Sequence, residues 1–164
     1  MNLGLHDKVA LVLAASKGLG LACAKGLFAE GANIAICSRS QENLTQAKKE
    51  ILKVSSDQPL NKILTLVVDL KFEDQIKSLV SKTIEEFGKI DILVHNAGGP
   101  PSAPISGISK EDWQNSINLN LLSLIRTSKL VIPVMQHKKF GRIIAITSVS
   151  VKQPLNNLVL SNTT

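Results

Sequence analysis

The sequence predicts an α/β fold in which helices cover both faces of a parallel sheet, a doubly wound arrangement. Short apolar runs recur along the chain, too short for helices and of the length expected for buried parallel strands. Amphipathic segments with apolar residues at helical spacing separate these runs. Strands that alternate with helices in this way form one open parallel sheet, because each connection must cross over the sheet before the next parallel strand begins.

The first predicted unit is a strand, a Gly-rich loop, a helix and a second strand. The strands are the apolar runs Val9–Leu13 and Asn33–Cys37. The loop contains Gly18 and Gly20, and the helix that follows ends before Gly31, since a glycine commonly follows the last turn of a helix. This unit has the length of a βαβ crossover.

The same alternation continues through the rest of the chain. Three further strands are predicted at residues 63–68, 90–94 and 141–147, and three helices after Ser40, between Phe72 and Gly88, and from Ser109 to His137. The two serines are of a type that commonly caps helices. Residues 55–61 and 99–107 are predicted loops, and residues 148–164 carry no predicted element. Because no linker interrupts this pattern, residues 1–164 are expected to form a single domain.

Composition narrows the function classes. The formal net charge is +6, but the basic residues are dispersed and only four Phe and one Trp could stack on bases, so no nucleic-acid partner is expected. No uninterrupted apolar run reaches the ~18 residues of a membrane-spanning helix, and the first residues lack the layout of a signal peptide. We therefore expect no membrane partner and a cytoplasmic location. Cys23, Cys37 and the three histidines show no metal-ligand spacing, so no metal site is expected.

The Gly-rich loop indicates a phosphate ligand. Without a Cβ atom, Gly18 and Gly20 allow a tight turn and a close approach of the backbone to a ligand. The following helix directs its free N–H groups and the positive end of its dipole toward that ligand, commonly a dinucleotide pyrophosphate. An ordinary turn between a strand and a helix is the alternative explanation.

Polar residues follow the predicted strands, at the edge of the sheet where open α/β sheets bind ligands. They are Ser16, Lys17, Ser38, Arg39, Asp69, Asn96 and Ser148. The sequence therefore predicts one ligand site beyond the carboxyl ends of the strands.

These motifs and their order resemble the short-chain dehydrogenase/reductase family. That family opens with Thr-Gly-x-x-x-Gly-x-Gly, and residues 13–20 align with it, with leucine and alanine at the first two positions and both later glycines present. The other matching motifs are Asp69-Leu70, His95-Asn96-Ala97-Gly98, Trp113 followed by Asn120-Leu121, and Gly141-Arg142-Ile143-Ile144 followed by Ser148. The resemblance implies a Rossmann fold that covers about the first three-fifths of the family's length and lacks its last strands.

The resemblance also implies which residues bind the cofactor. They are Ala14, Ser16, Lys17, Gly18, Leu19, Gly20, Ser38, Arg39, Asp69, Leu70, Asn96, Ala97 and Gly98. In the family, the Asp-Leu pair lies by the adenine, and the Asn-Ala-Gly motif steadies the central strand beside the cofactor. Asn96 is accordingly expected to be architectural.

The end of the second strand predicts NADP(H) as the cofactor. NAD enzymes usually carry an acidic residue there to hold the ribose 2′-OH. Ser38 occupies that place, and Arg39 follows it. A guanidinium binds a 2′-phosphate bidentately, and Lys17 adds a second positive charge. A solvated arginine at a strand end is the alternative explanation for Arg39.

The family's catalytic residues are a serine, an asparagine, a tyrosine and a lysine, and they match only in part. Ser148 matches the serine and Asn120 the asparagine, although a turn role for the first and a purely structural role for the second remain open. The tyrosine position falls on Ser161, and the chain contains no tyrosine. A serine hydroxyl is a poor proton donor at neutral pH but can hydrogen-bond a carbonyl. The lysine position would be residue 165, one past the printed sequence.

Two functions are therefore predicted. The first is an NADP(H)-dependent oxidoreductase acting on a small carbonyl or acyl substrate, similar to 3-oxoacyl reductases, in which this chain alone is expected to be inactive. The alternative is a non-catalytic dinucleotide-binding or interaction protein. The resemblance implies a homo-oligomer. The apolar edge at residues 143–146 predicts that these 164 residues alone associate or fold marginally.

Overall fold

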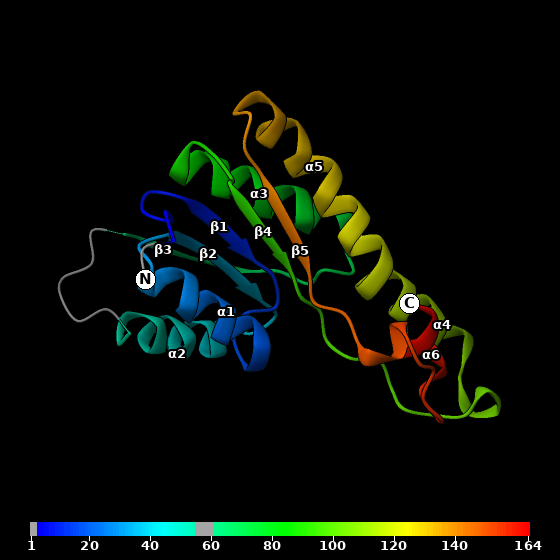
Figure 1. The fold of residues 1–164 in the computed structure, drawn as a ribbon. Coiled ribbons are helices and arrows are strands. Elements are labelled where there is room, and N and C mark those ends of the chain that lie inside the picture. The colour runs from blue at the N-terminus through cyan, green and yellow to red at the C-terminus, as the bar shows by residue number, and fades with distance from the viewer. Residues whose placement is uncertain (1–2, 55–60) are drawn as a thin grey trace.

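The chain is organised around one parallel sheet. A computed structural model describes residues 3–54 and 61–164, so the predicted loop at residues 55–61 falls almost entirely outside the described residues. The sheet has five strands in the order β3-β2-β1-β4-β5, and every neighbouring pair is parallel (Figure 1). The strands are β1 (Val9–Val12), β2 (Asn33–Ser38), β3 (Ile63–Val67), β4 (Ile92–His95) and β5 (Arg142–Ala145).

Helices lie on both faces of the sheet. They are α1 (Gly18–Ala29), α2 (Gln41–Leu52), α3 (Glu73–Phe87), α4 (Lys110–Ser116), α5 (Ser123–His137) and α6 (Val159–Thr163). Figure 1 shows α1 and α2 on one side of the sheet and α3 and α5 on the other. The strand order reverses between β1 and β4, which is the point where such sheets bind ligands.

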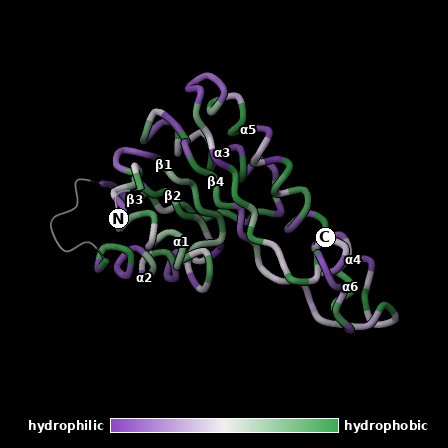
Figure 2. The backbone as a smooth tube through the Cα atoms, viewed as in Figure 1, coloured by the Kyte–Doolittle hydropathy of each residue, from purple (hydrophilic) through white to green (hydrophobic). Residues whose placement is uncertain are grey.

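The core explains why the strands are apolar without alternation. Ala10 and Val12 of β1 pack in the cluster that includes Ala24 and Phe28 of α1. Leu11 of the same strand packs in the other cluster, with residues of α3 and α5. Because side chains alternate between faces and both faces are covered, every residue of β1 is buried. Figure 2 shows the apolar colouring along these strands. The predicted doubly wound fold is confirmed.

The predicted helix ends are also confirmed. Ser40 Oγ accepts a hydrogen bond from the Asn43 N–H at the start of α2, and Ser109 forms a capping box with Asp112 at the start of α4. Gly88 ends α3 with φ 74°, in the left-handed region that favours glycine.

The long predicted helix differs from expectation at its centre. Residues 110–137 are helical throughout, but Ile117–Leu122 form a π-helical turn between α4 and α5. Apolar spacing predicts a helix but does not distinguish hydrogen bonds to the fourth from bonds to the fifth preceding residue. Residues 148–164, for which no element was predicted, contain the short helix Val149–Val151 and α6.

Residues 110–137 form a long helix that is apolar in composition. By length and composition this 28-residue helix could cross a membrane, with a mean hydropathy of 1.2 in its most apolar window. The prediction that no uninterrupted apolar run reaches this length still holds, because Arg126 and Lys129 interrupt the segment. Val131 and Met135 of the helix pack against the sheet, and 17% of the most apolar window is buried.

Strand β5 forms an open edge of the sheet. Ile143 and Ile144 are 40% and 50% exposed, as the sequence predicted for this edge, whereas Ile146 is half-buried against the core. The backbone groups of β5 that face away from β4 pair with no further strand among residues 3–54 and 61–164.

Candidate active site

The Gly-rich loop turns tightly between β1 and α1. Ala14 and Gly18 adopt positive φ values of 47° and 55°. A Cβ atom at Gly20 would lie 2.8 Å from the Ala14 carbonyl oxygen and 2.8 Å from Asn96 Nδ2. The loop therefore requires glycine at residue 20 for space and favours it at residue 18 for conformation.

The first turn of α1 is left without a side-chain cap. Lys17 is the N-cap residue, and its side chain accepts no hydrogen bond from the helix. The first N–H groups of a helix have no partner within the helix, and they carry the positive end of its dipole. Gly18, Leu19 and Gly20 form this turn, and Leu19 is exposed. The loop thus has the elements of a phosphate-binding turn.

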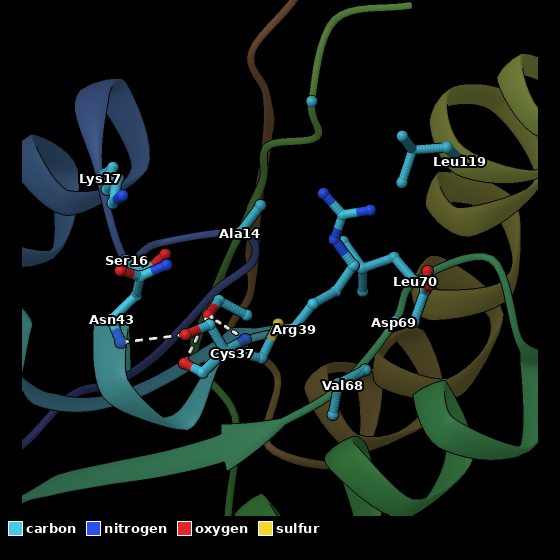
Figure 3. A pocket seen from close by; sticks show the side chains of 13 residues that line it. Ala14, Ser16, Lys17, Cys37, Arg39, Asn43, Val68, Asp69, Leu70 and Leu119 are labelled. Carbon is cyan, nitrogen blue, oxygen red and sulfur yellow. Dashed lines mark hydrogen bonds between the residues drawn. The ribbon is translucent and has the colours of Figure 1, made fainter. Parts of the chain in front are cut away.

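A cavity of about 650 Å³ lies beside this loop, at the carboxyl ends of β1, β2 and β3. Eight of the residues predicted to bind the cofactor line it, namely Ala14, Ser16, Lys17, Ser38, Arg39, Asp69, Leu70 and Gly98. Figure 3 shows Ser16, Lys17 and Asn43 on one side of the cavity, Leu119 on the other, and the Arg39 side chain extending between them. The topology has therefore gathered residues from three strand ends into one hollow.

Arg39 and Lys17 are the two cations of this cavity. Both are exposed, and neither side chain forms a hydrogen bond or an ion pair with residues 3–54 or 61–164. Ser38 Oγ instead accepts a hydrogen bond from the Ser40 N–H at 3.2 Å, which shapes the turn into α2. The cavity thus presents two unpaired positive charges and, among its lining residues, one carboxylate.

That carboxylate belongs to Asp69 and is used within its own turn. Its Oδ1 accepts the Lys71 N–H at 3.0 Å, and its Oδ2 lies 4.0 Å from Lys71 Nζ. The buried Leu70 follows it in the wall of the cavity. Asp69 is therefore oriented by local bonds rather than by the cations of the cavity.

Asn96 has an architectural position. Its Nδ2 donates to the carbonyl oxygens of Leu13 and Ala14 at 3.4 and 3.2 Å. These bonds tie the end of β4 to the Gly-rich loop. Asn96 does not line the larger cavity, and Ala97 lines a second one.

The second cavity, of about 200 Å³, lies beyond the ends of β4 and β5. It brings together Asn120, Ser148 and Ser161, the three residues predicted to be catalytic. Asn120 lies in the π-turn, Ser148 lies three residues after the end of β5, and Ser161 lies in α6. Gly98 lines both cavities, so the two hollows adjoin.

Asn120 is held by two hydroxyl groups. Its Nδ2 lies 3.4 Å from both Ser116 Oγ and Thr164 Oγ1, and these oxygens lie 2.7 Å from each other. This contact joins the long helix to the end of α6. Nδ2 is the donor in both contacts, and Asn120 Oδ1 forms no hydrogen bond with the described residues.

Ser148 and Ser161 face the same cavity with different surroundings. Ser148 Oγ accepts the Ser150 N–H at 3.2 Å, which is a turn-forming bond, and its own proton remains available. Ser150 Oγ donates to the Ser161 carbonyl oxygen at 3.2 Å, which ties the short helix to α6. The Ser161 hydroxyl bonds no described residue.

His95 is the one ionisable side chain that lines the smaller cavity in the described part of the chain. It is 4% exposed, and burial lowers its pKa to about 4, so the imidazole is neutral at neutral pH. Its Nε2 lies 2.8 Å from Ser123 Oγ.

Sequence reasoning missed several residues of both cavities. Asn43 and Leu119 line the larger cavity, and His95 and Thr164 the smaller one. For Asn43 the signal was its place three residues after the predicted cap at Ser40. No group of three or more His, Cys, Asp or Glu residues that could hold a metal occurs within residues 3–54 and 61–164.

Residues 8–160 match the family model of the short chain dehydrogenases. The chain belongs to the short-chain dehydrogenase/reductase family. Among its relatives, an uncharacterized oxidoreductase of Staphylococcus saprophyticus is 35% identical over 146 residues, which cover 89% of this chain and 61% of the relative. The 3-oxoacyl-(acyl-carrier-protein) reductase of Escherichia coli is 36% identical over 147 residues, covering 90% of this chain and 57% of that reductase.

Solved structures agree with the family. The L-sorbose reductase of Gluconobacter frateurii, complexed with NADPH and L-sorbose, superposes with a TM-score of 0.91 at 30% identity, covering 99% of this chain and 60% of the reductase. An NAD⁺-bound xylitol dehydrogenase gives a TM-score of 0.88 at 27% identity, covering 97% and 60%. The chain therefore spans about 60% of the length of these relatives, and members of the fold with either nicotinamide cofactor are among them.

Proposed function

We propose that this chain forms the cofactor-binding part and a share of the active site of an NADP(H)-dependent oxidoreductase that interconverts a carbonyl and an alcohol. The unpaired guanidinium of Arg39 in the larger cavity is the observation that carries the choice of cofactor. An arginine without an internal partner, beside a neutral Ser38, favours a ligand with an additional phosphate. L-Sorbose reductase, with bound NADPH, supports the same choice.

The residues of the larger cavity fit a dinucleotide phosphate. The cradle at Gly20 leaves no room for a Cβ atom, and α1 begins with uncapped N–H groups. Lys17 and Arg39 would hold phosphate charge, while Asp69 and Leu70 would line the base. In the bound enzyme the nicotinamide supplies or accepts the hydride.

The smaller cavity would hold the reacting carbonyl. Ser148 has a free hydroxyl proton and can donate it in a hydrogen bond to the substrate oxygen, which stabilises charge that develops there. Asn120 offers an unbonded Oδ1 that can orient water or substrate. Ser161 can hydrogen-bond the carbonyl, but the pKa of an aliphatic hydroxyl is too high for efficient proton transfer at neutral pH.

The substrate class follows from the lining and from relatives. Besides the neutral His95, the lining residues of the smaller cavity carry no ionisable side chain. A neutral carbonyl compound is therefore the favoured substrate, and three 3-oxoacyl-(acyl-carrier-protein) reductases among the relatives support an acyl ketone. We further propose that the protein is a cytoplasmic homo-oligomer without nucleic-acid or membrane partners.

Cofactor titrations test this function. NADPH and NADH are added separately to the intact polypeptide, and binding is followed by nicotinamide fluorescence. We expect NADPH to bind at least tenfold more tightly than NADH, and Arg39→Ala to remove most of that difference. Lys53→Ala, which removes a positive charge outside the cavity, should leave it unchanged. Equal affinities in the unmodified protein would refute the choice of NADP(H).

The absence of tyrosine favours a second candidate, a non-catalytic dinucleotide-binding or interaction protein. Both candidates predict cofactor binding, and these 164 residues alone are expected to be inactive, so binding of a carbonyl substrate separates the candidates. Binding of a 3-oxoacyl thioester to the NADPH-bound chain, weakened in Ser148→Ala, supports the oxidoreductase. Tight NADPH binding without binding of the thioester supports the second candidate.

A further inference from the structure

The buried pair His95 and Ser123 joins the end of β4 to the start of α5. His95 Nε2 lies 2.8 Å from Ser123 Oγ, and the two residues are 4% and 0% exposed. The Ser123 hydroxyl also donates to the Leu119 carbonyl oxygen. A hydroxyl has a single proton, so its oxygen must accept from His95. The hydrogen bonds therefore assign the His95 proton to Nε2.

Ser123 closes the π-turn that carries Asn120. The Ser123 N–H bonds the carbonyl oxygen of Asn118, five residues back, instead of that of Leu119, four residues back. The Ser123 hydroxyl bonds the Leu119 carbonyl, the position that an α-helical N–H would take. His95 occupies the acceptor side of this hydroxyl and thereby directs its proton toward Leu119. Asn120 is the next residue and lines the smaller cavity.

The other end of this connection is the Gly-rich loop. Asn96, which follows His95, donates to the carbonyl oxygens of Leu13 and Ala14. Two consecutive residues at the end of β4 thus contact the loop beside the larger cavity and the helix beside the smaller cavity. A single peptide unit therefore separates the two contacts.

We propose that His95 is a positioning residue that acts through Ser123 to hold Asn120 in the π-turn and to couple it to the Gly-rich loop. The consequence for catalysis rests on the proposed function, whereas the positioning itself does not. The neutral state of His95 supports this role, since a neutral imidazole offers one N–H donor and one acceptor.

The first test uses the unmodified protein without cofactor. In ¹⁵N-labelled intact polypeptide at neutral pH, long-range ¹H–¹⁵N spectra report the tautomer of each imidazole. We expect His95 to be protonated at Nε2 and unprotonated at Nδ1. The opposite tautomer would overturn the proposal without any substitution.

The second test follows the side-chain amide signals of Asn120, assigned by their loss in Asn120→Asp. Ser123→Ala and His95→Leu should each displace these signals, and His95→Gln, which retains an N–H donor, should restore at least half of the displacement. Thr83→Val is the matched control, because Thr83 is a fully buried hydroxyl that also bonds a carbonyl oxygen one turn back, on α3. Its displacement of Asn120 should be at least fivefold smaller. Unmoved Asn120 signals in Ser123→Ala and His95→Leu, or equal displacement in Thr83→Val, would refute the positioning.

Addition of NADPH then separates this proposal from the proposed function. In the unmodified protein, saturating NADPH should shift the Asn120 signals, and in Ser123→Ala the shift should fall at least twofold while the Kd for NADPH changes less than threefold. An undiminished shift in Ser123→Ala would refute the coupling. Absence of NADPH binding to the unmodified protein would refute the proposed function, and the two cofactor-free tests would still decide the positioning.

Discussion

Gly20 and Asn96 are packed so closely that a Cβ atom at residue 20 would lie 2.8 Å from Asn96 Nδ2. The same atom would lie 2.9 Å from the Ala15 Cα, so the backbone would have to move as well. This contact joins the first turn of α1 to the end of β4. The loop, the helix and the strand can therefore approach this closely only because residue 20 has no Cβ atom.

We expect Gly20→Ala to lower the free energy of unfolding by about 1–3 kcal/mol, the usual cost of overpacking a filled site. It should also weaken NADPH binding, because the loop must shift. Gly26→Ala, in the same helix, meets no atom within 4 Å and should instead stabilise the protein by about 0.5–1 kcal/mol. Urea unfolding followed by circular dichroism measures both. Equal effects of the two substitutions would contradict this account.

Ala14 should be improved by glycine. Its φ of 47° lies in the left-handed region, which costs an L-residue about 1–2 kcal/mol. Part of the gain is offset by the greater freedom of glycine in the unfolded chain, so Ala14→Gly should raise the free energy of unfolding by about 0.5–1 kcal/mol. Ala15→Gly, at a buried neighbour outside that region, should lower it. A destabilised Ala14→Gly would show that the methyl group makes contacts worth more than the strain.

The buried His95 should make stability depend on pH. Its pKa is lowered to about 4 in the folded protein, whereas an unfolded histidine titrates near 6.5. Between these values the unfolded state binds the additional proton, so stability is complete above pH ~6.5 and falls as pH drops toward ~4. The loss amounts to about 3 kcal/mol.

Urea unfolding between pH 4 and 7 measures this dependence. His95→Gln should flatten the profile, and His137→Gln, at an exposed residue, controls for the loss of an imidazole as such. A profile that keeps its full slope in His95→Gln would assign the dependence to other groups.

The open edge at β5 should make these 164 residues associate. Ile144 is 50% exposed on this edge strand, and unpaired strand edges template further pairing. Ile144→Lys should reduce association measured by sedimentation velocity. Leu52→Lys, at a 42% exposed residue at the end of α2, should not. A monodisperse monomer before substitution would refute the prediction.

The sequence by itself determined the fold and the order of its elements. Apolar runs such as β1 specify strands, and capping residues such as Ser40 specify helix ends, through interactions between near neighbours in the sequence. The sequence also indicated that the site lies beyond the carboxyl ends of the strands, because parallel strands all end on the same side of the sheet. The family resemblance rested on the same residues.

Only the tertiary structure decided which side chains meet. The link from His95 to Ser123 and the contact between Ser116 and Thr164 join residues 28 and 48 positions apart, and no local pattern encodes such pairs. The π-turn at Ile117–Leu122 was equally invisible, because its hydrogen bonds shift by one residue while the apolar spacing still reads as helix. The physical reason is the distance along the sequence. Strands and helix caps depend on residues that are close neighbours in the sequence, whereas the site depends on packing between elements that are far apart in it.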